Sequence, residues 1–124
     1  MIGIDLIKTS RMERFIKRFG ERALHKFLST DEMLLVKNYK TASGFWAAKE
    51  ACSKALGVGI GSECAFGDIT IYKTSSGAPK LKLSQKLLEN FNISDCSLSI
   101  THDGDYAIAV VAIESSPADK IKQL

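Results

Sequence analysis

Two lysines, a serine and a carboxylate lie close together in the middle of the chain, among very small residues. They belong to the segment Trp46-Ala47-Ala48-Lys49-Glu50-Ala51-Cys52-Ser53-Lys54-Ala55-Leu56-Gly57. At about 100° per residue in a helix, two arcs form: Ala48, Ala51, Cys52 and Ala55 on one side, and Lys49, Glu50, Ser53 and Lys54 on the other. The small arc predicts close packing of a firmly held helix. The polar arc predicts either a solvated surface with one ion pair or a helix surface that carries the side chains of a functional site.

Asp5 is a second carboxylate in an unusual place, inside the apolar, strand-like run Met1–Ile7. Aspartate is rare in strands, and one in the first strand of a domain must be exposed at an edge, hydrogen-bonded or bound to a cation. A strand Asp5 facing a helical Glu50 would hold one hard divalent ion such as Mg²⁺, with water and a substrate oxygen completing its shell. Lys54 beside that ion suits a phosphate group, because both can share its negative oxygens. These three residues therefore predict magnesium-dependent phosphate chemistry.

Four segments spread over nearly the whole chain match a known set of signatures in order and spacing. They are Gly3-Ile4-Asp5-Leu6, residues 46–57, Gly77-Ala78-Pro79-Lys80-Leu81 and Ser99-Ile100-Thr101-His102. With these segments the chain resembles the bacterial holo-[acyl-carrier-protein] synthases, which are small 4′-phosphopantetheinyl transferases. The resemblance implies Mg²⁺-dependent transfer of the 4′-phosphopantetheine arm of coenzyme A to a serine of an apo acyl carrier protein, with release of adenosine 3′,5′-bisphosphate. It also implies the α+β fold of that family.

The resemblance assigns roles to the matching residues. Asp5 and Glu50 are implied as Mg²⁺ ligands and, with Lys54, as the catalytic residues. Implied coenzyme contacts are Lys54, Gly57, Gly77, Pro79, Thr101 and His102. The attacking serine must lose a proton, and either Glu50 or a metal-bound water would accept it. The implied assembly is a homotrimer in which His102 of one chain completes the site of its neighbour. Phe45 stands where many relatives carry an arginine, so the anion contact made there is absent or made elsewhere.

Seven basic residues against two acidic ones lie between Lys8 and Lys26. On a helical wheel Arg11, Arg14 and Arg18 form a narrow arc beside an apolar one. Such a stripe is consistent with a solvated face or with a docking surface that steers an acidic partner. The resemblance implies docking of the acidic acyl carrier protein, with Arg11, Arg14, Arg18 and Arg22 as candidates.

Two other functions remain open from the residues alone. A basic nucleic-acid-binding module would use the arginine helix to follow phosphates, but it has no interleaved aromatics on an exposed strand and leaves Asp5 and Glu50 without a role. A carrier-binding scaffold without catalysis predicts that both acids can be removed harmlessly.

Composition is that of a soluble, single-domain protein. The 124 residues are 45% apolar and 25% charged, with a net charge of +3. Cys52, Cys64 and Cys96 contain no CxxC spacing, so neither a disulfide framework nor a zinc site is expected. We find no membrane-spanning run and no signal peptide pattern. These features predict a cytoplasmic protein with no membrane association.

Turn and cap signals divide the chain into short elements. We expect strands over residues 2–7, 67–73, 97–102 and 106–113, and helices over 10–19, 23–27, 30–36, 46–56 and 85–91. Ser29 and Glu32 predict a capping box, Gly57 a helix end, and Asp103-Gly104 a type I′ hairpin turn. The sum is one α+β domain over residues 1–114, with a mainly antiparallel sheet and packed helices. A loose tail is expected over 115–124.

Overall fold

The computed structural model describes residues 1–116. From the N-terminus the elements are β1 (Ile2–Lys8), α1 (Thr9–Phe19), α2 (Glu21–His25), α3 (Thr30–Met33), α4 (Tyr39–Ala55), the 3₁₀ helix η1 (Phe66–Asp68), β2 (Ile69–Lys73), β3 (Pro79–Leu83), α5 (Gln85–Asn90), β4 (Ile93–Asp103) and β5 (Tyr106–Ser115). Within this range the chain forms an α+β fold in which every strand pairing is antiparallel. No helix of residues 1–116 is long and apolar enough to cross a membrane.

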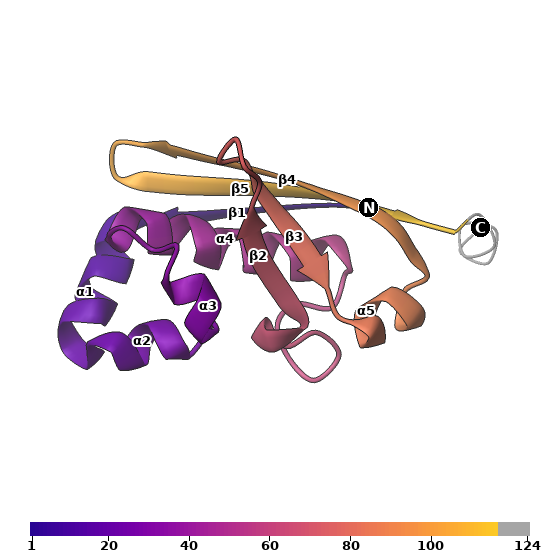
Figure 1. The fold of residues 1–124 in the computed structure, drawn as a ribbon, viewed down its shortest axis with the longest axis horizontal. Coiled ribbons are helices and arrows are strands. Elements are labelled where there is room, and N and C mark those ends of the chain that lie inside the picture. The colour runs from indigo at the N-terminus through magenta and orange to yellow at the C-terminus, as the bar shows by residue number, and fades with distance from the viewer. Residues whose placement is uncertain (117–124) are drawn as a thin grey trace.

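A three-stranded sheet in the order β1-β5-β4 forms one layer, and α4 lies across one of its faces (Figure 1). Alternate residues of β5 point toward α4 and are buried: Ala107, Ala109, Val111 and Ile113. On β1 the same face carries Gly3, Asp5 and Ile7, because side chains alternate along a strand. A Cβ atom built on Gly3 would collide with the carbonyl oxygen of Ala51, so α4 lies directly against the β1 backbone at this point.

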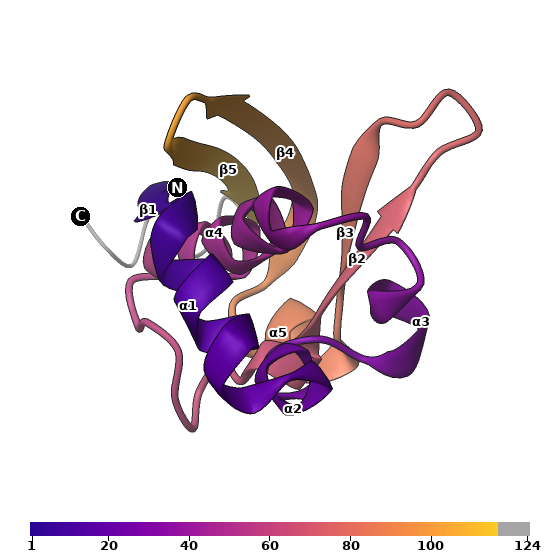
Figure 2. The same cartoon turned by 90° about the vertical axis from the view of Figure 1, so that its left-hand side faces the viewer.

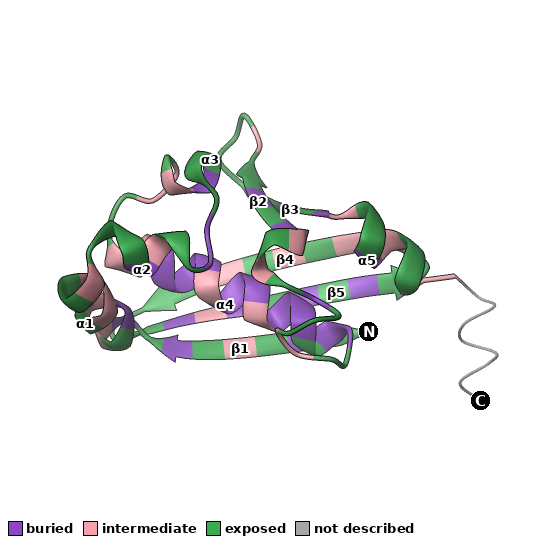
Figure 3. Ribbon diagram, turned by 90° about the horizontal axis from the view of Figure 1, so that it is seen from below, coloured by how far each residue is buried: buried purple, intermediate pink, exposed green. Residues whose placement is uncertain are grey.

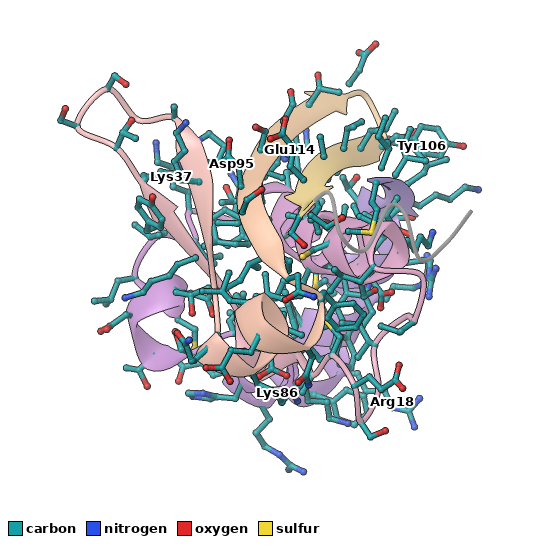
Figure 4. All side chains as sticks on the ribbon, turned by 90° about the vertical axis from the view of Figure 1, so that its right-hand side faces the viewer. Arg18, Lys37, Lys86, Asp95, Tyr106 and Glu114 are labelled. Carbon is teal, nitrogen blue, oxygen red and sulfur yellow. The ribbon has the colours of Figure 1, made fainter. Side chains whose placement is uncertain are left out.

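None of residues 1–116 covers the opposite face of this sheet. The exposed fractions of Ile2, Ile4 and Leu6 on β1 are 74%, 59% and 56%, and Tyr106 and Val110 on β5 are exposed as well. In Figure 4, Tyr106 extends outward from the start of β5. A single sheet thus has its core on the α4 side and an apolar surface on the other.

A second sheet of β2 and β3 stands apart from the first, with α3 beside it (Figure 2). Ile71 and Leu81, which pair across the two strands, both point into the core. Helix α4 contacts the three-stranded sheet on one side, and α1 and β2 on others. Figure 3 accordingly shows α4 as a mainly buried helix.

Several element boundaries differ from expectation. Helix α4 begins at Tyr39 rather than residue 46, because the Asn38 side chain accepts hydrogen bonds from the Lys40 and Thr41 amides and caps an earlier start. The capping box at Ser29 and Glu32 is confirmed, but α3 ends at Met33. Gly57 follows the last turn of α4 with φ 79°, as predicted for a helix end.

The hairpin between β4 and β5 is confirmed, but its predicted turn type is wrong. Asp103 pairs with Tyr106, so the two loop residues are Gly104 and Asp105. Only Gly104 of these two has a positive φ, of 56°. A type I′ turn needs positive φ at both loop residues, whereas glycine at the first position is the pattern of type II′. Strand β5 runs to Ser115, and residues 117–124 of the expected tail lie outside the described residues.

Candidate functional site

Asp5 and Lys54 meet between β1 and α4. Lys54 Nζ lies 2.7 Å from Asp5 Oδ1 and also donates to the Ile4 carbonyl oxygen at 3.3 Å. The side chain of Asp5 is 13% exposed, whereas that of Lys54 is 51% exposed. Asp5 is therefore the more buried partner, and the half-exposed Lys54 side chain reaches it from the surface.

Glu50 lies one turn before Lys54 on α4 and is half-buried. Burial raises the pKa of Glu50, the charge of Asp5 raises it further, and Lys54 opposes both. The two carboxylates are thus close enough to repel one another, and a cation between them would relieve that repulsion. The structure brings together all three residues predicted to form the catalytic centre.

The two carboxylates fit a magnesium ion by their chemistry. Both offer hard oxygen ligands, and Mg²⁺ in proteins is often held by one or two carboxylates while it keeps several waters. Among residues 1–116 there is no group of three or more His, Cys, Asp or Glu side chains suited to a metal. A site here would therefore rest on Asp5 and Glu50 alone and leave positions open for substrate oxygens.

The exposed polar arc predicted for α4 is wrong at two of its four residues. Lys49 and Ser53 are buried. Lys49 Nζ lies 2.9 Å from Glu32 Oε1, and the Ser53 hydroxyl donates to the Glu50 carbonyl oxygen at 2.7 Å. The helix is covered on this side by α3 and β2, which a helical wheel of α4 alone does not reveal. Glu32 was predicted only as a capping residue.

His102 and Thr101 lie on β4, on opposite faces of the sheet. The His102 ring packs against α4 at Gly44, where an added Cβ would lie 2.8 Å from Nε2. In the strand register His102 lies opposite Ala107, which in turn lies opposite Ile7 of β1. Strand β5 therefore separates His102 from β1 by two strand spacings, about 10 Å, and one chain does not bring His102 to the Asp5 carboxylate.

The remaining predicted coenzyme contacts lie on two loops. Gly57 is in the exit from α4, while Gly77 closes the turn between β2 and β3 and Pro79 begins β3.

The arginine stripe borders a cleft of about 510 Å³. Its lining residues are Ile7, Arg11, Met12, Arg14, Phe15, Arg18, Phe19 and Trp46. Trp46 was not predicted to line a cleft. Its ring contacts Phe27 edge-to-face and Phe66 at a tilted angle. Arg22 lies on α2 and does not line this cleft.

Two residues that line the cleft are close neighbours of the acidic pair. Ile7 and Asp5 share one face of β1, and Trp46 and Glu50 are one turn apart on α4. A partner seated among the arginines would consequently place a protruding group near Asp5 and Glu50.

All three cysteines are free thiols. Burial raises the pKa of Cys52 to about 12 and that of Cys64 to about 11. Burial also raises the pKa of Cys96. Thiols with raised pKa values are poor nucleophiles, so the chemistry of the site rests on the charged residues.

Comparisons with known proteins identify the family of the chain. The sequence model of the 4′-phosphopantetheinyl transferase superfamily matches residues 1–111. The holo-[acyl-carrier-protein] synthase of Sulfurimonas denitrificans is 69% identical over 98% of this chain and 100% of its own length, and that of Wolinella succinogenes is 54% identical over 95% and 100%. A crystal structure of the Helicobacter pylori holo-[acyl-carrier-protein] synthase in complex with coenzyme A has a TM-score of 0.89 and 47% identity, covering 92% of this chain and all of that chain.

Proposed function

The chain belongs to the 4′-phosphopantetheinyl transferase superfamily, and we propose that Asp5, Glu50 and Lys54 form the centre at which its reaction takes place. The reaction is transfer of the 4′-phosphopantetheine arm from coenzyme A to a serine of an apo acyl carrier protein, with adenosine 3′,5′-bisphosphate as the leaving group. The observation that carries the assignment of the centre is the Asp5–Lys54 contact beside Glu50, next to Ile7 and Trp46 of the arginine-lined cleft.

The serine hydroxyl attacks the β-phosphorus of the coenzyme pyrophosphate in line with the leaving group. Such transfers depend on positioning and charge neutralisation more than on covalent help from the protein. Asp5 and Glu50 would hold Mg²⁺, which when bound supplies positive charge to the pyrophosphate oxygens. Lys54 contributes a second positive charge, and its half-exposed side chain is free to exchange Asp5 for a phosphate oxygen.

The attacking serine must lose its proton. Glu50 or a water held by the bound Mg²⁺ is the proposed acceptor, because both would lie beside the attacking hydroxyl. Asp5, paired with Lys54, keeps the role of a charged ligand.

The arginine cleft is the proposed docking site for the carrier. Its floor is apolar, formed by residues such as Met12 and Phe15, and Arg11, Arg14 and Arg18 border it. An acidic partner with an exposed apolar group would match both features. Arg22, outside the cleft on α2, would contribute only long-range attraction.

A homotrimer with active sites between subunits is the proposed assembly. Ile2, Ile4, Leu6, Tyr106 and Val110 form one exposed apolar face of the sheet, and a second copy of the chain is the proposed cover. Because β5 separates His102 from Asp5 within one chain, a neighbouring copy is the natural source of the histidine that contacts the coenzyme. We place the enzyme in the cytoplasm, where free thiols such as its three cysteines persist.

Mixing the protein with coenzyme A, Mg²⁺ and an apo acyl carrier protein, and then weighing the carrier by mass spectrometry, tests the reaction. The expected result is a carrier heavier by one 4′-phosphopantetheine group, dependent on both Mg²⁺ and coenzyme A. A carrier that binds without gaining mass would instead identify a scaffold. Binding of nucleic acid with no effect on the carrier would identify a basic binding module.

A further inference from the structure

A buried ion pair lies on the side of α4 that faces away from the sheet. Lys49 Nζ is 2.9 Å from Glu32 Oε1, and the two side chains are 1% and 2% exposed. Neither residue reaches solvent or the cleft, so neither contacts a substrate. Lys49 nevertheless directly precedes Glu50 in the chain, which makes its partners relevant to the site.

The pair ties four segments together through hydrogen bonds. Lys49 also donates to the Phe66 carbonyl oxygen at 3.2 Å. Glu32 Oε2 accepts from the backbone N–H of Ile71 at 2.8 Å, and Glu32 Oε1 accepts from the N–H of Ser29 at 2.9 Å. The polar groups of both side chains are consequently partnered, and the pair connects α3, α4, η1 and β2.

Stability alone does not explain such a pair. Removing two charges from water is costly, and a well-packed apolar pair of similar volume is often as stable or more stable. Burial lowers the pKa of Lys49, and only the hydrogen bond and charge of Glu32 oppose this. What an apolar pair would lack is the directional bond to the backbone of β2, because an apolar side chain cannot accept the Ile71 N–H.

The strand held in this way leads to the turn proposed to contact coenzyme A. Ile71 lies opposite Leu81 in the β2–β3 hairpin, and Lys73 lies opposite Pro79 next to the turn. In Figure 2 the hairpin stands apart from the three-stranded sheet, with α3 at its side. The bond from Glu32 to Ile71 therefore joins this hairpin to the helix that carries Glu50.

We propose that the Glu32–Lys49 pair positions the β2–β3 hairpin, and with it the turn at residues 77–79, relative to Glu50. Coenzyme A bound by this turn is then held with its pyrophosphate at the proposed centre. This inference rests on the proposed function. Both members of the pair are positioning residues, acting through the hairpin on one side and α4 on the other.

Steady-state kinetics of Glu32→Gln and Lys49→Met test the proposal. We expect the KM for coenzyme A to rise by about tenfold or more, while kcat at saturating coenzyme A stays within about threefold and the KM for the carrier is unchanged. Lys49→Arg, which keeps the charge and can still donate to Glu32, should recover most of the affinity for coenzyme A.

Ser29→Ala is the matched control, since it removes the hydroxyl that accepts from the Glu32 N–H but leaves the bonds of Glu32 to Lys49 and Ile71 in place. It should lower the melting temperature without changing the KM for coenzyme A. If Ser29→Ala and Glu32→Gln raise this KM equally at equal loss of stability, the pair is only structural and the proposal is overturned.

Amide hydrogen exchange gives a readout that does not depend on transfer. Residues 69–73 should exchange faster in Glu32→Gln than in the wild-type protein, while residues 44–52 of α4 stay protected. Unchanged exchange at β2 would overturn the proposal even if the variant is less active. A wild-type protein that protects β2 in this way but never modifies the carrier would instead overturn the proposed function.

Discussion

Lys54 Nζ lies 2.7 Å from Asp5 Oδ1, so a cation from α4 neutralises the carboxylate of β1. Lys54 is half exposed, and an ion pair of this kind contributes at most about 1 kcal/mol to stability. The contact thus adds little to the fold. Its interest is chemical, because it holds an ammonium group at the carboxylate that is proposed to bind Mg²⁺.

Asp5→Asn and Glu50→Gln should each lower kcat by about 100-fold or more, because each keeps the shape of the side chain and deletes a charged ligand. Circular dichroism and the melting temperature should stay close to wild type, since neither carboxylate is in the core. Calorimetric titration with Mg²⁺ in the presence of coenzyme A should show weaker metal binding in both variants.

Glu89→Gln is the matched control for this pair of variants. Glu89 is an exposed carboxylate on α5 that accepts a hydrogen bond from Gln85, and its replacement should leave transfer unchanged. Wild-type activity of Asp5→Asn or Glu50→Gln at saturating Mg²⁺ would rule out the proposed metal ligands.

Lys54→Met retains the apolar stem and loses the ammonium, so kcat should fall by roughly 100-fold if this charge stabilises the transition state. Lys86 on α5 (Figure 4) forms a comparable ion pair, with its Nζ 2.8 Å from Asp68 Oδ2. Lys86→Met breaks this pair and should have no effect on transfer. A Lys54→Met enzyme whose only change is a higher KM for coenzyme A would make Lys54 a binding residue instead.

The double variant Arg11→Glu/Arg18→Glu should raise the KM for the carrier by about tenfold or more and leave the KM for coenzyme A nearly unchanged, because both arginines border the docking cleft. Charge steering is screened by salt, with a Debye length of about 10 Å at 0.1 M. The wild-type enzyme should therefore lose carrier affinity as ionic strength rises, whereas the double variant should depend on salt only weakly.

Lys17→Glu/Lys37→Glu makes the same change in net charge with residues that do not line the cleft. A similar loss of carrier affinity in this control would mean that net charge alone attracts the carrier. Carrier kinetics of the arginine variant that match wild type at low salt would show that the stripe is only a solvated face.

The residues of the proposed catalytic centre could be picked out from the sequence because they lie in segments that local rules describe. The position of Asp5 in an apolar strand and the spacing of Glu50 and Lys54 on a helix are both visible in a short window of residues. The capping box at Ser29 and the hairpin near Gly104 are equally local. Each of these predictions needs only the periodicity of one element or the chemistry of one turn.

The burial of Lys49 could not be predicted in the same way. Its partner Glu32 is 17 residues earlier in the chain, and the wheel of α4 shows a lysine on the polar arc without showing that α3 and β2 cover it. Trp46 in the cleft and Gly44 against His102 depend likewise on contacts between elements. Which side of a helix is solvated is a property of the tertiary packing, and the sequence pattern of one helix does not contain it.

Gly3→Ala should destabilise the protein by about 1–3 kcal/mol through overpacking, since a Cβ there would collide with the Ala51 carbonyl oxygen and lie 2.5 Å from Ala55 N. Backbone atoms of α4 cannot rotate away as a side chain can. Gly67→Ala is the control, because a Cβ at Gly67 meets nothing within 4 Å. Equal free energies of unfolding for the two variants, measured with denaturant, would contradict the close approach of β1 and α4.

Two inactive variants should complement one another if the active sites lie between subunits. Chains with Asp5→Asn retain His102, and chains with His102→Ala retain Asp5. In a mixed assembly, some sites combine the intact Asp5 of one chain with the intact His102 of its neighbour. When both chains are co-expressed in equal amounts and assemble at random, half of the chains can supply each residue, so about a quarter of the sites should be active.

The measurement is the transfer rate of the co-expressed hybrid against each variant alone. Ile4→Lys, introduced into both chains, is the control: a charge on the apolar β1 face should prevent assembly, give a monomer in light scattering and abolish the recovery. Mixing the two variants after separate purification should restore little activity if the subunits exchange slowly. A hybrid that assembles but stays as inactive as its parents would contradict a site shared between Asp5 of one chain and His102 of its neighbour.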